Sequence, residues 1–182
     1  YEGAATALTK VIQKGVKDKE IFNMHGLALA QQGECTESSK SLAATVSMGV
    51  SDKDVFTHLG SCQYKAGENA AAIESLSRAI NMGVSTKEVY LYKGQAEYAQ
   101  KDYDNATKDL EKAVSLGAKE YDAFKNLGDM AFLKNNYPNA IKYYDQAIAL
   151  AAKDAVVFNN RGKAKLNQGE TQAAIADFDK AL

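Results

Sequence analysis

Residues 90–107 read YLYKGQAEYAQKDYDNAT, and the spacing within this segment recurs along the chain. Its glycine belongs to a series with an interval of 34 residues, which comprises Gly26, Gly60, Gly94, Gly128 and Gly162. Two more series share that interval, Gly15, Gly49, Gly83 and Gly117 in one and Gly33, Gly67 and Gly169 in the other, with Lys101 and Asn135 in the vacant places. A fixed period of this length indicates a repeat protein, in which each unit packs against its neighbours.

Aromatic and aliphatic residues recur in the same register and predict helices. An aromatic residue lies four positions before each glycine of the first series, at Phe22, Phe56, Tyr90, Phe124 and Phe158. Neighbouring apolar columns within a unit are three or four residues apart, which is the period of a helix and not of a strand. We therefore expect two helices in each unit, over residues 87–100 and 104–116 in the unit that contains the quoted segment.

The expected helix ends carry suitable residues. Side chains that can accept hydrogen bonds from free backbone N–H groups stand at the starts of the first helices, at Asp18, Asp52, Thr86 and Asp154. Gly49, Gly83 and Gly117 stand where the second helices end and where a left-handed residue is favourable. Pro138 falls in the first turn of a second helix, where its missing N–H costs nothing.

The first glycine series lies in the middle of an expected helix, where glycine costs about 1 kcal/mol relative to alanine. Its recurrence predicts that the paired helix of the unit approaches closely at this point. A column of large apolar residues recurs in the paired helices, at Leu8, Leu42, Leu76, Leu110, Tyr144 and Phe178. We assign this column to the core.

The quoted segment and its repetition resemble the tetratricopeptide repeat, a helix–turn–helix unit of 34 residues. The resemblance covers the whole chain and divides it into a half repeat (1–18), four full repeats (19–52, 53–86, 87–120 and 121–154) and an incomplete repeat (155–182). It implies an all-α fold, a right-handed α-solenoid of stacked antiparallel helix pairs that forms a single array over residues 1–182. The sequence departs from the family pattern just before the mid-helix glycine, where the usual leucine is replaced by His25, Lys93 and Arg161 in three repeats.

Composition excludes several classes of protein. The chain is 46% apolar and 25% charged, with a net charge of −1, so it offers no electrostatic basis for binding nucleic acid or an anionic membrane. No apolar run approaches the roughly 18 residues that a membrane span requires. Two cysteines in 182 residues do not make a disulfide scaffold. The segment from Tyr1 to Lys10 does not have the pattern of a signal peptide.

Few residues could support catalysis or bind a metal. The best metal candidate is His58 with Cys62, one helical turn apart, and it would need further ligands from His25 or Cys35. Cys62 occupies a packing column, so we interpret it as a buried thiol. No nucleophile elbow, zinc-protease motif or phosphate-binding loop is present. We expect no catalysis, no metal and no cofactor.

The resemblance places a partner-binding groove on the face of the first helices. The groove positions that it implies are Asn23, Leu27, His58, Ser61, Tyr64, Tyr92, Gln95, Tyr98, Lys125, Asn126, Asp129, Asn160 and Lys163. Tyr64 and Tyr98 share a column at the groove edge, and at this position a tyrosine could either pack in the core or contact a partner. One subclass of the family binds the C-terminal carboxylate of a partner. In this chain Asp129 occupies a position where that binding site needs Asn, and its negative charge would repel the carboxylate. Asn126 and Asn160 could hold a peptide backbone.

These observations predict a non-catalytic protein-interaction scaffold that binds a partner peptide or helix in the groove. One alternative is a docking module of a longer enzyme or assembly factor. A less favoured alternative is an RNA-binding helical repeat, because the balanced charge of the chain argues against binding RNA. We expect no direct membrane insertion. Phe178 and Leu182 belong to a core column that no following unit covers, so end-to-end self-association is expected at high concentration. The sequence does not decide the cellular compartment, which is either the cytoplasm or, if a signal segment was removed, the periplasm.

Overall fold

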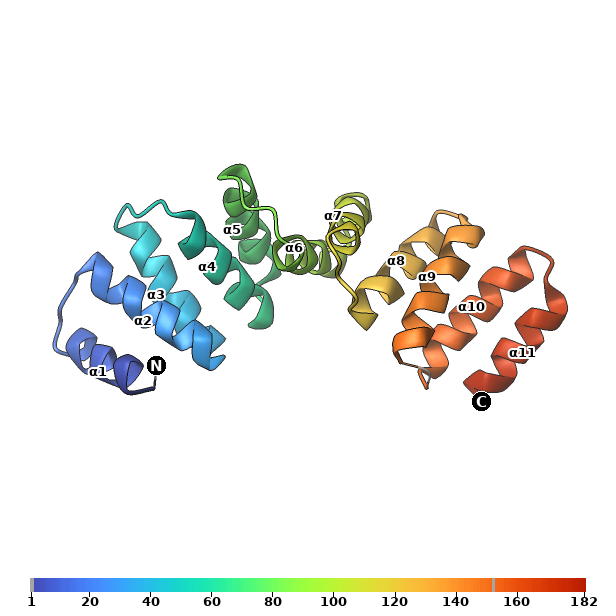
Figure 1. Ribbon diagram of the computed structural model, residues 1–182, viewed down its shortest axis with the longest axis horizontal. Coiled ribbons are helices and arrows are strands. Elements are labelled where there is room, and N and C mark those ends of the chain that lie inside the picture. The colour runs from blue at the N-terminus through green and yellow to red at the C-terminus, as the bar shows by residue number, and fades with distance from the viewer. Residues whose placement is uncertain (1, 152) are drawn as a thin grey trace. The chain divides into compact units, whose positions relative to one another are not determined.

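The computed structural model describes residues 2–151 and 153–182, and all the regular structure in these residues is α-helical (Figure 1). The expected all-α fold is therefore confirmed. The helices are α1 (Glu2–Gln13), α2 (Lys19–Gln32), α3 (Cys35–Ser47), α4 (Lys53–Lys65), α5 (Asn69–Asn81), α6 (Lys87–Ala99), α7 (Tyr103–Ser115), α8 (Tyr121–Leu133), α9 (Tyr137–Leu150), α10 (Ala155–Asn167) and α11 (Thr171–Ala181). Within the described residues, no helix has the length and apolar character needed to span a bilayer.

The chain divides into two compact units, one that ends at Asp102 and one that begins at Tyr103. Unit 1 contains α1 to α6, and unit 2 contains α7 to α11. The boundary separates the two helices of the third repeat. The single array over residues 1–182 stays a prediction, and each unit is described by itself below.

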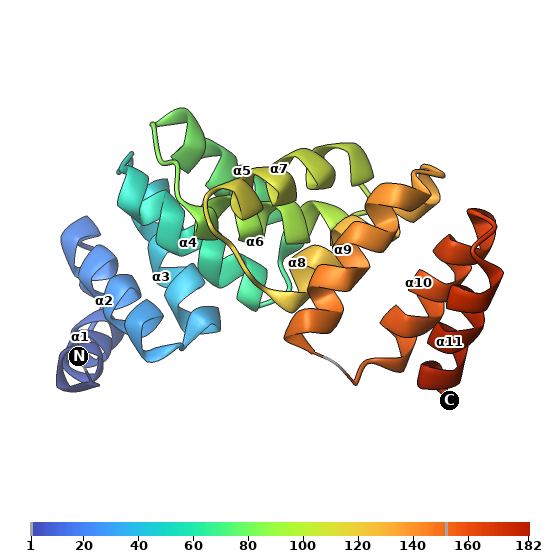
Figure 2. The ribbon, with the colours of Figure 1, turned by 45° about the vertical axis from the view of Figure 1, so that its right-hand side comes forward.

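Within each unit the helices of a repeat pack as antiparallel pairs, α2 with α3 and α4 with α5 in unit 1, and α8 with α9 and α10 with α11 in unit 2 (Figures 1 and 2). The first helices of successive repeats also contact one another. In unit 1 these are α2, α4 and α6, and in unit 2 they are α8 and α10. We call the surface that they form the first-helix face of each unit.

The expected helix ends are confirmed. Asp18 Oδ1 accepts hydrogen bonds from the backbone N–H groups of Glu20 (2.8 Å) and Ile21 (3.1 Å), and Asp52 and Asp154 cap α4 and α10 in the same way. Gly49, Gly83 and Gly117 follow second helices with φ of 87°, 91° and 95°, a left-handed conformation that suits glycine. Pro138 lies in the first turn of α9.

The mid-helix glycines allow the paired helix to approach closely. A Cβ on Gly60 would lie 2.6 Å from Cγ of Leu76 and 3.0 Å from its backbone nitrogen. Real Cβ atoms do not come this close to another heavy atom without a shift of the structure. The same conflict exists in three other repeats, between Gly26 and Leu42, Gly128 and Tyr144, and Gly162 and Phe178.

We predict that Gly60→Ala lowers the free energy of unfolding by about 1–3 kcal/mol through overpacking against Leu76. The gain in helix propensity, about 1 kcal/mol, opposes this loss and does not outweigh it. Urea unfolding followed by circular dichroism measures the difference. Gly3→Ala is the control, because no atom lies within 4 Å of the added Cβ, and its stability should be unchanged or higher. A Gly60→Ala protein as stable as the original would contradict the close approach.

His25 occupies the position of a core leucine and joins three helices. Thr9 Oγ1 on α1 donates to the carbonyl of Ala5 (2.9 Å), so its oxygen accepts from Nε2–H of His25 (2.9 Å). Nδ1 of the ring, 2.8 Å from Oγ of Ser41 on α3, then accepts the hydrogen of that hydroxyl. Both ring nitrogens are satisfied in the neutral form. Burial lowers the pKa of His25 below its ordinary value of 6.5, against the smaller opposing effect of Glu37.

Unit 1 should consequently lose stability in mild acid. In the unfolded chain the imidazole binds a proton as the pH falls through about 6.5, while the folded, buried ring resists protonation. The free energy of unfolding therefore decreases as the pH falls below 6.5 and stops changing once the folded ring is also protonated. We expect His25→Leu to show a smaller loss of stability between about pH 7.5 and about pH 5.5 than the original chain. Equal pH dependence of the two proteins in urea unfolding would contradict the neutral, buried ring.

Candidate functional site

A cleft of about 320 Å³ lies between α8 and α10 on the first-helix face of unit 2. It is lined by Lys125, Asp129, Phe132 and Leu133 from α8, by Tyr144 from α9, and by Val156, Asn160 and Lys163 from α10. Four of these residues, Lys125, Asp129, Asn160 and Lys163, are groove positions that the sequence predicts. We call this site the α8–α10 cleft.

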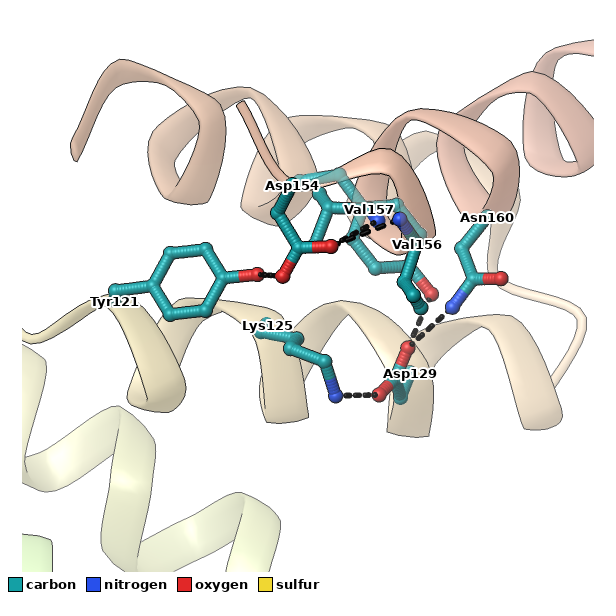
Figure 3. Close-up of polar contacts among 8 residues, drawn as sticks. Tyr121, Lys125, Asp129, Asp154, Val156, Val157 and Asn160 are labelled. Carbon is teal, nitrogen blue, oxygen red and sulfur yellow. Dashed lines mark hydrogen bonds and ion pairs between the residues drawn. The ribbon is translucent and has the colours of Figure 1, made fainter. Parts of the chain in front are cut away.

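The carboxylate of Asp129 organises the polar wall of the cleft (Figure 3). Nζ of Lys125, one turn earlier on α8, lies 3.2 Å from Oδ2 of Asp129. Oδ1 accepts hydrogen bonds from the hydroxyl of Tyr144 (2.8 Å) and from Nδ2 of Asn160 (3.1 Å). Donors from three helices thus converge on one acid. The amide of Asn160, expected to hold a peptide backbone, gives one of its hydrogens to Asp129.

The beginning of α10 is fixed by a second acid, Asp154. Its Oδ1 accepts hydrogen bonds from the backbone N–H groups of Val156 (2.8 Å) and Val157 (3.4 Å), while its Oδ2 accepts from the hydroxyl of Tyr121 on α8 (Figure 3). The bond from Tyr121 is the main cause that lowers the pKa of Asp154 below its usual value. Burial, followed by the bond to Asp154, raises the pKa of Tyr121. The charged carboxylate therefore ties the first turn of α10 to α8.

Arg161 anchors the opposite side of α10. Its guanidinium donates to Asp177 on α11 through Nε (2.8 Å) and Nη2 (2.5 Å), and Nη1 donates to Asp145 on α9 (2.5 Å). Nζ of Lys165 also lies 2.8 Å from Asp177, which is only 2% exposed. A buried carboxylate is tolerated here because two cations and directed hydrogen bonds replace water. The helix that carries half of the cleft is thereby held in place.

Two aliphatic side chains at the cleft are left in water. Leu133 is 61% exposed and Val156 is 55% exposed. Phe132 also lines the cleft and packs its ring against that of Tyr137, with the ring centres 5.6 Å apart. Sequence reasoning did not select these residues. A signal for Val156 was present, since the corresponding positions of four repeats carry acids, at Glu20, Asp54, Glu88 and Asp122.

Unit 1 carries an aromatic pair on its first-helix face. The rings of Tyr64 on α4 and Tyr92 on α6 are stacked, with centres 5.3 Å apart and planes at 24°. Nζ of Lys65 lies 5.6 Å from the centre of the Tyr92 ring, within range of a cation–π contact. Two predicted groove residues are therefore in contact. Lys65 was missed, because it stands next to Tyr64 in sequence rather than at a repeated groove position.

The other predicted residues of unit 1 are engaged locally. His58 Nδ1 donates to the carbonyl of Asp54 (2.8 Å), and the hydroxyl of Ser61 donates to the carbonyl of Thr57 (2.7 Å), both within α4. Leu27 on α2 packs against a core cluster that contains Leu42. Asn23 is half-buried on α2, and Gln95 and Tyr98 are half-buried on α6.

Asn126 lies on α8 but does not line the α8–α10 cleft, so the structure does not bring it together with Asn160 there. The expectation that Cys62 is a buried thiol is confirmed, and Cys35 is also buried and free. Burial raises the pKa of the Cys62 thiol to about 11, with a further contribution from a hydrogen bond to Cys35. Among the described residues, no three His, Cys, Asp or Glu side chains are grouped so that they could hold a metal ion.

Comparison with known proteins agrees with this architecture. Models of the tetratricopeptide repeat match residues 23–87, 91–155 and 155–182. Among solved structures, MamA is similar at 21% identity over 90% of each chain, with a TM-score of 0.74. YrrB, described as a TPR protein with an unusual peptide-binding site, is similar at 17% identity over 97% of this chain and 91% of its own, with a TM-score of 0.76. No curated protein sequence matches the chain. The family models cover most of the sequence, and this chain belongs to the tetratricopeptide-repeat family.

Proposed function

We propose that this chain is a non-catalytic protein-interaction module that binds an extended segment of a partner protein on the first-helix faces of its units. The observation that carries the proposal is the α8–α10 cleft, in which exposed Leu133 and Val156 adjoin an amide and charged groups. Concave sites with apolar walls and a few convergent polar groups are the usual form of binding sites. Apolar side chains left in water at such a site favour contact with a partner.

The stacked pair Tyr64 and Tyr92 supports a second contact, on unit 1. Tyrosine is enriched where protein surfaces meet, because its ring offers a large rigid area and its hydroxyl tolerates water. The cation of Lys65 above the Tyr92 ring adds a polar edge to this surface. Each unit therefore presents a distinct combination of apolar and polar groups.

A role in binding rather than catalysis is supported by the composition of the α8–α10 cleft. Its described lining contains no serine, threonine, cysteine or histidine. Its one carboxylate, on Asp129, already accepts hydrogen bonds from Lys125, Tyr144 and Asn160. Family membership points in the same direction, and the peptide-binding site ascribed to YrrB indicates that a protein with this fold can carry one.

The test begins with a random peptide library displayed on phage and selected on the immobilised chain. Fluorescence anisotropy with the strongest selected peptide gives the dissociation constant for the original chain and for two variants. Val156→Asp replaces an apolar side chain of the α8–α10 cleft by a charged one. It should weaken the binding of a peptide to unit 2 by about tenfold or more. Tyr92→Ala should weaken a peptide bound to unit 1 by roughly thirtyfold, the effect of losing about 2 kcal/mol at an aromatic contact.

The matched control is Leu116→Asp, which introduces the same charge at a half-exposed leucine just after the end of α7, outside the cleft. It should leave the dissociation constant nearly unchanged, and circular dichroism should show that all three variants are folded. The proposal is wrong if no peptide is selected. It is also wrong if Leu116→Asp abolishes binding while Val156→Asp and Tyr92→Ala leave it intact.

A further inference from the structure

We infer that the α8–α10 cleft selects a partner segment in which a large apolar side chain stands next to an acidic side chain. The inference rests on the proposed function and specifies the chemistry of its ligand. It depends on two features of the cleft, an apolar wall that the fold does not require and a single cation that the chain does not neutralise.

The apolar wall is a departure from the repeat. In four other repeats the position of Val156 holds an acid, which interacts favourably with the positive end of its helix. In α10 this interaction is left to Asp154, whose carboxylate accepts from the backbone of Val156 and Val157. Val156 itself is more than half exposed and lies in the cleft with exposed Leu133. An apolar side chain of a partner that enters the cleft would shield part of this apolar surface from water.

The charge of the cleft comes from Lys163. Lys125 is paired with Asp129, so these two charges compensate each other. The positions on α10 from which a side chain could neutralise Lys163, three or four residues away, hold Asn159, Asn160, Leu166 and Asn167, none of them acidic. Among the described residues, no carboxylate lies within ion-pair distance of Nζ of Lys163. The cleft thus presents one exposed cation beside its apolar wall.

The acid that suits this cation is a side chain rather than the C-terminus of a chain. Recognition of a terminal carboxylate needs several free donors that converge on it, and the donors of Lys125 and Asn160 are directed at Asp129. The negative charge of Asp129 would also repel a terminus placed between them. Lys163 alone is a flexible point charge, which matches the carboxylate of an aspartate or glutamate next to the apolar residue.

The test uses blocked hexapeptides and nitrogen-15 NMR of the full chain. The probe is Ac-Gly-Ser-Leu-Glu-Gly-Ser-NH2, and its analogues replace Glu by Gln, Glu by Lys, or Leu by Ala. We expect the probe to shift the amide signals of α8 and α10 and to bind about threefold to fivefold more tightly than the Gln peptide. The Ala analogue should bind about tenfold more weakly than the probe.

A charge reversal on the protein provides the decisive comparison. Lys163→Glu should reverse the preference, so that the Lys peptide binds more tightly than the Glu peptide. Lys142→Glu is the matched control, because it makes the same change at an exposed lysine of α9 outside the cleft, and it should keep the original preference. Both variants alter exposed residues, and their thermal melts should match that of the original chain.

Several results would overturn the inference without touching the proposed function. One is that peptides selected from the library bind through Val156 but show no dependence on an acidic residue or on Lys163. Another is that an unblocked peptide ending in leucine binds more tightly than the probe, which would assign the carboxylate to a chain terminus. A third is that inorganic phosphate shifts the same amide signals as strongly as the probe, which would show that the cleft binds any anion and does not select an apolar side chain. Failure to select any peptide would instead remove the proposed function itself.

Discussion

The absence of a Cβ atom at one position of each first helix determines how the helices of this protein pack. The space that the Cβ of Gly60 would occupy is filled by the side chain of Leu76, and Gly26, Gly128 and Gly162 have the same arrangement with their paired helices. Because the contact is present in the helix pairs that contain Gly26, Gly60, Gly128 and Gly162, the two helices of each of these pairs are locked in one register. That register fixes which residues of the first helix face the core and which face outward, so the position of the first-helix face depends on it.

Within this frame, polar residues replace core leucines without disrupting the fold. His25 is accepted because Thr9 and Ser41, on the helices to either side, complete the hydrogen bonds of a neutral ring. Arg161 is accepted because Asp145 and Asp177 bring acceptors from the flanking helices. In both cases the satisfied polar group joins three helices, where a leucine would join them by packing alone. These positions therefore hold neighbouring helices together while the repeat period is preserved.

The sequence predicted the periodic part of the structure well and the cleft only in part. Helix bounds agree to within about one residue in the third repeat, because caps and glycines mark them locally. Repeat register also predicted Lys125, Asp129, Asn160 and Lys163 as groove residues, and these four lie together. Register could not show which side chain bonds to which. The pairing of Asn160 with Asp129 depends on rotamers and on a tyrosine from another helix, while Asn126, equivalent to Asn160 in the repeat, lies outside the cleft.

Tyr144 combines core packing with a hydrogen bond to a cleft residue in one side chain. Its ring fills the space beside Gly128, where another described repeat has the leucine Leu76, and its hydroxyl reaches Asp129 in the cleft. The side chain is only 1% exposed, so a partner would never touch much of it. The fourth repeat is consequently not an interchangeable module. Exchanging it for another repeat of the chain would remove Tyr144 and Asp129 together, because no other repeat has a carboxylate at the position of Asp129, and Asn160 on the next first helix would lose the acceptor that orients its amide.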